Sequence, residues 1–165
     1  MISTDNVSPG FDAARDTHYM REALKLAEQA ASLGEVPVGC VIVDSDKIIA
    51  AECNRRETTN DATAHAELLA LRAAGQSRPS WRLDGCDLYV TLEPCLMCSG
   101  AIIQSRIRRL VFGAADPKGG MAGSVSNVFE LPSNHQVLIT GQVLAEECSL
   151  LLKNFFRDRR LVQGE

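Results

Sequence analysis

Two kinds of apolar segment alternate along the chain, and their order limits the fold more than any other feature of the sequence. Long segments with apolar residues at helical spacing predict helices, and short β-branched segments predict strands. The predicted order is α-β-β-α-β-α-β-β-α, without internal repeats. This pattern is typical of a sheet with helices on both faces. The sequence therefore predicts an α/β protein with a three-layer α-β-α arrangement around a five-stranded mixed sheet, whose parallel strands lie in the second half.

Capping and turn residues set the predicted boundaries of these elements. Thr17 is expected to cap the first helix and Gly34 to end it, and residues 44–46 form a hairpin turn. Pro94 is predicted to open the third helix, because proline is favoured in the first helical position. The predicted helices are 17–33, 62–74, 94–106 and 144–160, and the predicted strands are 38–43, 47–52, 87–92, 109–113 and 137–140.

Size and composition fit one domain. The chain has 165 residues, 45% of them hydrophobic and 23% charged, and domains most often contain about 100–150 residues. We expect residues 17–165 to form a single domain and residues 1–16 to be a flexible tail, because that segment lacks the apolar core of a signal peptide. The longest apolar run, 36–43, is far shorter than the roughly 20 residues that cross a bilayer. These features predict a cytoplasmic protein without a membrane contact.

The charge argues only weakly against binding to nucleic acids. The formal net charge is −4, and contacts with phosphates need cations. Basic residues are concentrated at 106–109 and near the C-terminus, at Lys153, Arg157, Arg159 and Arg160. Each cluster by itself is more often a solvated surface than a nucleic-acid site.

Two short motifs supply a set of metal ligands. His65-Ala66-Glu67 and Cys95-Leu96-Met97-Cys98 each lie near the start of a predicted helix. Cys95 and Cys98 are three residues apart and share one helix face, and a helix N-terminus favours thiolates. Zn²⁺ accepts imidazole and thiolate ligands, and three protein ligands are typical of catalytic zinc, which leaves a fourth position to water. No fourth ligand is evident, so we predict one catalytic Zn²⁺ per subunit.

The other four cysteines lie among apolar neighbours. A cytosolic chain of this size favours metal binding or burial over disulfides. We expect these cysteines to be buried free thiols, at Cys40, Cys53, Cys86 and Cys148.

Glu67 is the candidate catalytic residue. On an ideal helix it lies about 200° around the axis from His65, so the two side chains share a direction only if the first turn relaxes. We interpret Glu67 as the general base and acid that moves protons between water and the substrate, and not as a ligand. Each motif alone is a weak signal, but H-x-E together with P-C-x-x-C is the signature of zinc nucleobase deaminases.

From these motifs outward the sequence resembles the bacterial tRNA-specific adenosine deaminases, which belong to the cytidine deaminase-like zinc deaminase superfamily. The resemblance covers nearly everything from about residue 18 to 160. The zinc motifs are shared across the superfamily. The segments that point to the tRNA branch are Gly-Glu-Val-Pro-Val-Gly at 34–39, Asp-Pro-Lys at 116–118 and Phe-Phe-Arg at 155–157.

This resemblance implies a cytidine deaminase-like fold, a homodimer and a reaction. The reaction is hydrolytic deamination of adenosine to inosine at the wobble position of a tRNA anticodon stem-loop, with release of ammonia. Asn54 would hydrogen-bond the flipped base, and Val38, Ala66 and Leu92 would lie around it. Without the resemblance, Val38 and Leu92 are better interpreted as core residues, and a loop-capping role for Asn54 is about as probable as base binding.

The resemblance also implies contacts with RNA beyond the base. Asp116 and Asn134 would contact the sugar or flanking bases, and Phe156 would stack on a base while Arg157 and Arg159 bind phosphates. Turn formation is the alternative for Asp116 and Asn134, and helix burial is the alternative for Phe156. The loop at 119–121 (Gly-Gly-Met) departs from the common small-residue version, and the tail after Arg160 is short.

Two other functions fit the same motifs. A deaminase of a free base or nucleotide, of the guanine or cytidine type, would share the catalytic residues on the same fold. A zinc-stabilised RNA-binding module would instead have a fourth protein ligand and no need for Glu67.

Overall fold

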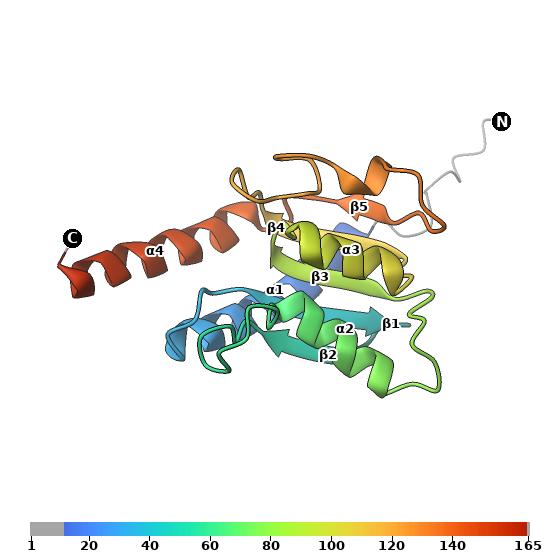
Figure 1. Cartoon of the computed structure of the whole chain (residues 1–165), viewed down its shortest axis with the longest axis horizontal. Coiled ribbons are helices and arrows are strands. Elements are labelled where there is room, and N and C mark those ends of the chain that lie inside the picture. Colours follow the sequence, from blue (N-terminus) through green and yellow to red (C-terminus); the bar gives the residue numbers. More distant parts are fainter. Residues whose placement is uncertain (1–11, 165) are drawn as a thin grey trace.

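The computed structural model describes residues 12–164, which form a five-stranded sheet between two layers of helices (Figure 1). The strands lie in the order β2-β1-β3-β4-β5. β1 (Gly39–Asp44) pairs antiparallel with β2 (Lys47–Cys53) and with β3 (Asp87–Leu92). β4 (Arg109–Ala114) runs parallel to β3 and to β5 (Leu138–Thr140). The predicted mixed sheet, with its parallel strands in the second half, is confirmed.

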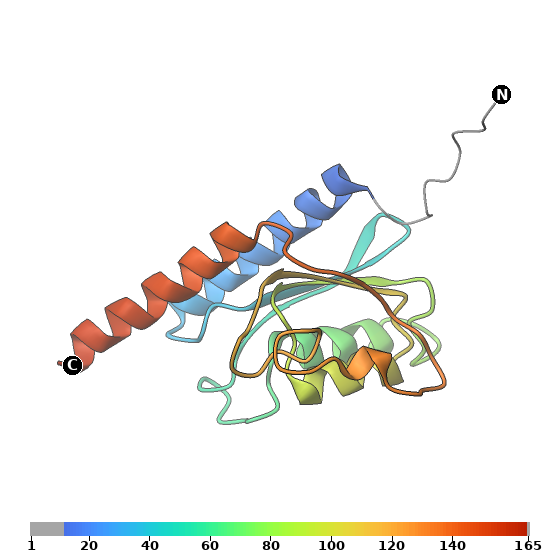
Figure 2. The ribbon, with the colours of Figure 1, turned by 90° about the horizontal axis from the view of Figure 1, so that it is seen from above.

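Helices cover both faces of the sheet. α1 (Ala13–Ser32) and α4 (Ala145–Gln163) lie side by side on one face, and α2 (Ala66–Gln76) and α3 (Leu96–Gln104) lie on the other (Figure 2). A short 3₁₀ helix, Val128–Glu130, precedes β5. Within residues 12–164, no helix combines the length and the apolar character that a membrane span requires.

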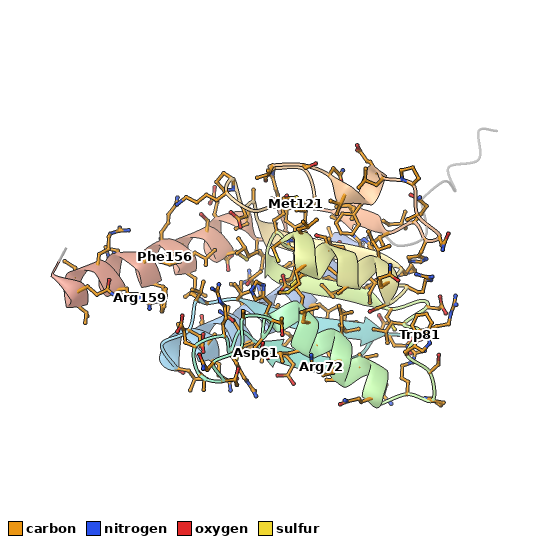
Figure 3. All side chains as sticks on the ribbon, in the orientation of Figure 1. Asp61, Arg72, Trp81, Met121, Phe156 and Arg159 are labelled. Atoms are coloured by element: carbon orange, nitrogen blue, oxygen red, sulfur yellow. The ribbon has the colours of Figure 1, made fainter. Side chains whose placement is uncertain are left out.

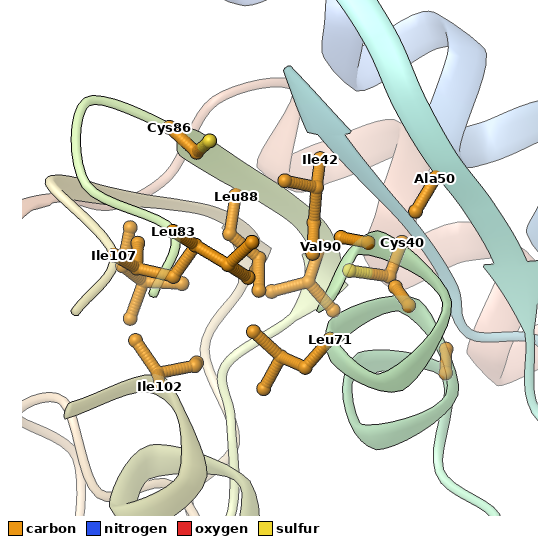
Figure 4. Packing of buried hydrophobic residues seen from close by; sticks show 14 of the residues in the cluster. Cys40, Ile42, Ala50, Leu71, Leu83, Cys86, Leu88, Val90, Ile102 and Ile107 are labelled. Carbon is orange, nitrogen blue, oxygen red and sulfur yellow. The ribbon is translucent and has the colours of Figure 1, made fainter. Parts of the chain in front are cut away.

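The alternation of side chains along the strands builds two cores. On β1, Val41 faces the α1 and α4 layer, while Cys40 and Ile42 face the α2 and α3 layer. Figure 4 shows this second core, in which Leu71 of α2 and Ile102 of α3 pack close to the sheet. The four cysteines outside the zinc motif are buried free thiols, as predicted.

α1 begins earlier than the sequence predicted. Its N-cap is Asp12 and not Thr17, because the Asp12 carboxylate accepts hydrogen bonds from the backbone N–H groups of Ala14 and Arg15, at 3.0 and 3.2 Å. Residues 13–16, which we expected in a flexible tail, are therefore helical. Residues 1–11 of the predicted tail lie outside the described residues.

α2 and α3 begin later than predicted, so that His65 and Cys95 precede the two helices and do not lie inside them. Residues before α2 form turns, in which Asp61 accepts a hydrogen bond from the Thr63 N–H at 2.8 Å, so the helix predicted from residue 62 begins at Ala66. Pro94 does not open α3, which begins at Leu96. The residues in front of these two helices, His65 and Cys95, are their N-caps and have extended backbones.

α4 continues to Gln163 and projects beyond the sheet (Figure 1). It can approach β4 closely because of Gly113, where an added Cβ would lie 2.7 Å from the Thr91 carbonyl oxygen and collide with Cys148 of α4. The side chains of the last turns, from Phe156 to Gln163, are exposed.

Candidate active site

Three metal-binding side chains converge from the starts of two helices. The Nδ1 atom of His65 lies 3.7 Å from the Sγ atom of Cys95 and 3.6 Å from that of Cys98. A tetrahedral zinc ion with ordinary bond lengths places a nitrogen and a sulfur ligand about 3.6 Å apart. Within residues 12–164 no other histidine, cysteine or carboxylate joins this group, and no second group of three forms. The donor set therefore fits a zinc ion held by three protein ligands.

The electrostatic surroundings favour the thiolate form of Cys95. Hydrogen bonds from the Cys98 thiol and from His65 lower the pKa of Cys95 to about 4, although burial opposes this shift. Its position as the N-cap of α3 also places it at the positive end of a helix. Zinc binds cysteine as a thiolate, so Cys95 is prepared for the metal.

Glu67 lies in the first turn of α2 and is only 4% exposed. Burial raises the pKa of Glu67 to about 7. The expected 200° separation from His65 does not apply, because His65 is the N-cap with φ −72° and ψ 148° and lies outside the helical spiral. Both side chains line the same cavity.

That cavity has a volume of about 200 Å³. Pockets for drug-sized ligands are larger, at roughly 300–1,000 Å³, so this one suits a single base-sized group. Its lining includes zinc-site residues together with side chains from the strand ends and from two loops. The lining residues are Glu35, Val36, Val38, Asn54, Arg56, Glu57, His65, Ala66, Glu67, Leu92, Glu93, Cys95 and Asp116.

Comparisons with known proteins agree with this geometry. Residues 13–114 match the family described as the cytidine and deoxycytidylate deaminase zinc-binding region. The tRNA-specific adenosine deaminase of Bacillus subtilis (strain 168) is 48% identical over 147 residues, which cover 88% of this chain and 91% of the relative. The chain belongs to the tRNA-specific adenosine deaminase family.

Solved structures share the fold of this deaminase. A structure of a tRNA:A34 deaminase, which carries out A-to-I editing at the wobble position of transfer RNA, has a TM-score of 0.78 and 44% identity. The match covers 82% of this chain and 99% of the solved structure. The guanine deaminase from Nitrosomonas europaea has a TM-score of 0.70 and 26% identity, with coverage of 88% of this chain and 84% of the other. The chain thus shares its architecture with a guanine deaminase as well, but its sequence identity to that enzyme is much lower than its identity to the tRNA:A34 deaminase.

The structure brings most of the predicted base-contacting residues to the cavity. Val38, Ala66, Leu92 and Asp116 line it. Asn54 lines it too, and also caps the loop as its alternative role required: its Nδ2 donates to the Val36 carbonyl, and its Oδ1 accepts from the Arg56 N–H, each at 3.2 Å. An amide has a second proton and a second lone pair, so both roles are compatible.

Asn134 does not line the cavity. It is exposed in the loop before β5, where Nε2 of the neighbouring His135 lies 2.6 Å from the Ile107 carbonyl oxygen. Ile107 precedes β4, whereas Asp116 follows the other end of that strand. Asn134 and the cavity therefore lie at opposite ends of β4.

The predicted RNA-binding residues of α4, which are Phe156, Arg157 and Arg159, do not line the cavity. Figure 3 shows Phe156 and Arg159 at the end of the molecule opposite Trp81. Burial opposes the ionisation of Glu35, but hydrogen bonds from Thr58 and Glu57, helped by the charge of Arg159, lower its pKa. Glu35 lines the cavity, so the Arg159 charge acts on one of the cavity residues.

Sequence reasoning assigned no role to two buried carboxylates, Glu35 and Glu93. Glu35 accepts hydrogen bonds from the N–H groups of Glu57 and Thr58 and from the Thr58 hydroxyl. Glu93 accepts hydrogen bonds from the loop after β4, including those of the Asp116 and Ala122 N–H groups. The available signal was an acidic residue inside an otherwise apolar stretch, which indicates a carboxylate with partners elsewhere in the chain.

Proposed function

We propose that this enzyme converts adenosine to inosine at the wobble position of a tRNA anticodon, with release of ammonia. The observation that carries the proposal is the group of His65, Cys95 and Cys98 beside the buried Glu67, in a cavity sized for one base. The names of the relatives that cover most of the chain support tRNA as the substrate.

His65, Cys95 and Cys98 would hold the zinc ion. When bound, zinc supplies a polarised water molecule whose pKa is lowered. Glu67 accepts one proton from water as the water oxygen bonds to the ring carbon, and it gives this proton to the ring nitrogen. It then accepts the second proton from the new hydroxyl group and gives it to the amine, which leaves as ammonia when the C–N bond breaks. Its burial in the first turn of α2 holds the carboxyl at one place for each of these transfers.

The cavity walls would hold the flipped base. Asn54 has a free amide proton and a free lone pair for the polar edge of the purine. Val38, Ala66 and Leu92 offer apolar surface to the base. Asp116, at the loop side of the cavity, would contact the ribose or a flanking base.

α4 would bind the RNA around the flipped nucleotide. Phe156 is 42% exposed, which is unusual for a phenylalanine and suits stacking on a base. Arg157 and Arg159 are exposed on the same projecting helix and suit phosphates. Asn134 lies at the other end of β4, so its contact with RNA is proposed only for nucleotides outside the flipped one.

The homodimer and the cytoplasmic location are also proposals. α3 presents Leu96 and Met97, which are 61% and 36% exposed, on a helix that begins at the zinc site. Exposed apolar side chains of this kind support an interface between two copies. The proposed tRNA substrate supports a cytoplasmic location for the enzyme.

The experiment is to incubate the zinc-loaded protein with bulk tRNA, with an anticodon stem-loop that carries a wobble adenosine, and separately with adenosine, cytidine and guanine. We expect inosine at the wobble position of the RNA and no turnover of the free compounds. Turnover of the free compounds alone would overturn the tRNA assignment in favour of a free-base deaminase. Binding of RNA without any deamination would favour a zinc-stabilised binding module.

A further inference from the structure

Glu93 is a buried carboxylate between β3 and the zinc ligand Cys95, and it is only 2% exposed. Its Oε2 atom accepts hydrogen bonds from the Asp116 N–H, at 2.9 Å, and from the Ser124 hydroxyl. Its Oε1 atom accepts from the N–H groups of Ala122 and Ser124, both at 3.0 Å. All four donors belong to the loop 116–124, which follows β4.

Glu93 lines the cavity, but these four hydrogen bonds occupy its carboxylate. A carboxylate has about four lone-pair positions on its two oxygens. In Glu93 the loop fills all of them, so the carboxylate has no free position for a metal ion or for the substrate. Its contribution must pass through the loop that it holds.

Two further contacts join this loop to the strand end. The Met121 N–H donates to the Pro94 carbonyl oxygen at 3.0 Å. Gly120 packs against the Glu93 carboxylate, where an added Cβ would collide with the carboxylate and lie 2.6 Å from the Asp116 carbonyl oxygen. Residues 93–94 and the loop 116–124 therefore form one packed unit, next in sequence to Cys95.

We propose that Glu93 is a positioning residue that sets the loop 116–124, and with it Asp116, against the zinc site. Asp116 and Cys95 both line the cavity. Glu93 holds Asp116 by a hydrogen bond to its N–H, and it lies only two residues before Cys95 in the chain. The expected task is substrate binding, because the anchored loop carries none of the zinc ligands and not Glu67. This inference rests on the proposed function, since Asp116 would contact the RNA.

Glu93→Gln tests the proposal. The glutamine amide replaces one acceptor oxygen by an N–H₂ group that faces donors of the loop. We expect the KM for the anticodon stem-loop to rise about tenfold while kcat stays within about twofold, which is the signature of lost binding without lost chemistry. Zinc content should stay equal to that of the wild type. Amide hydrogen exchange of peptides covering 116–124 should become faster.

Three further variants keep the test decisive. Ser124→Ala removes one donor and should raise the KM about threefold. Gly120→Ala keeps the glutamate at position 93 but adds a methyl group that collides with its carboxylate, so this variant should also raise the KM. Asp87→Asn is the matched control, because Asp87 is a buried carboxylate at the opposite end of β3 from Glu93, where it binds Arg15 and Arg108. It should lower the unfolding temperature and leave the KM unchanged.

The proposal is overturned by an unchanged KM in the folded Glu93 or Gly120 variants. It is also overturned if zinc content or kcat falls while the KM stays the same, or if Asp87→Asn raises the KM equally. Should Glu93→Gln not fold, Ser124→Ala and Gly120→Ala decide. Should the wild type leave the stem-loop unchanged, the proposed function fails by itself, and hydrogen exchange still decides whether Glu93 anchors the loop.

Discussion

At the scale of single residues, the proposed mechanism assigns metal binding and proton transfer to different side chains. Glu67 is buried beside the ligands but is not one of them. Glu67→Gln keeps the size of the side chain and removes its ability to accept a proton. We expect deamination to fall by about 10²–10⁴-fold, the usual range for a lost general base. Zinc content and the unfolding temperature should stay near those of the wild type.

The control for this prediction is Glu52→Gln. Glu52 is a half-buried carboxylate on β2 that pairs with Arg55 at 3.4 Å and does not line the cavity. Its substitution should leave kcat unchanged. If Glu67→Gln keeps wild-type activity in a single-turnover assay, the assigned mechanism is wrong.

Glu35 gives a second prediction, on pH and stability. Its pKa lies below the usual value, because hydrogen bonds from Thr58 and Glu57 outweigh burial. A lowered pKa in the folded state stabilises the protein above the unfolded value of about 4.3, and this contribution is lost as the pH falls further. Glu35→Gln should therefore be less stable at pH 7, and its stability should fall less between pH 5 and 3. Urea unfolding across this range measures both, and parallel curves for the two proteins would contradict the prediction.

The contrast between Glu67 and Glu93 shows which site residues could be predicted from the sequence. His65, Glu67, Cys95 and Cys98 were identified because their spacing within short motifs carries the chemistry. Glu93 was not identified, because its partners lie 23 to 31 residues further along the chain. Short-range patterns hold no information on which loop returns to a given carboxylate.

At the scale of the elements, a buried ion pair joins α1 to the sheet. The Asp16 carboxylate binds the Arg109 guanidinium of β4 at 2.9 and 2.6 Å and accepts a hydrogen bond from the Tyr89 hydroxyl at 2.9 Å. Asp16→Ala leaves a buried charge without its partner, so we expect a loss of about 3–5 kcal/mol in the free energy of unfolding. Chemical denaturation measures this loss.

The matched control is the pair between Arg21 of α1 and Glu147 of α4. These side chains are 54% and 51% exposed and 3.0 Å apart. Arg21→Ala should cost no more than about 1 kcal/mol, because solvent screens exposed pairs. Equal losses in the two variants would show that burial does not decide the strength of these pairs.

The buried pair between Asp16 and Arg109 explains why the start of α1 could not be predicted. Residues 12–16 contain three charged residues and no large apolar side chain, and such a segment near a terminus indicates a tail when only local sequence is considered. The partner that makes Asp16 a core residue lies 93 positions away. In contrast, β3 was predicted with its observed bounds, because its apolar alternation and its flanking turns are local.

At the scale of the whole molecule, the net charge of −4 hides an uneven distribution. α4 projects from the sheet with its last turns in solvent, and it carries Arg157 and Arg159 (Figures 1 and 3). A hollow lined in part by Lys118, Lys153 and Arg160 lies along the same helix. An overall acidic enzyme can therefore still present a cationic surface to RNA.

Salt dependence tests whether this helix binds phosphates. Each phosphate contact on single-stranded RNA adds about 0.7 to the slope of log K against log salt. The double variant Arg157→Ala, Arg159→Ala removes two such contacts and should therefore weaken stem-loop binding and lower the magnitude of this slope by about 1.4. The control is Lys47→Ala with Arg82→Ala, which changes the net charge equally at exposed positions outside α4. If both double variants shift the slope equally, the effect comes from total charge and α4 has no special part in binding. If only the α4 variant shifts it, the projecting helix is the electrostatic contact that lets an acidic protein hold a polyanion.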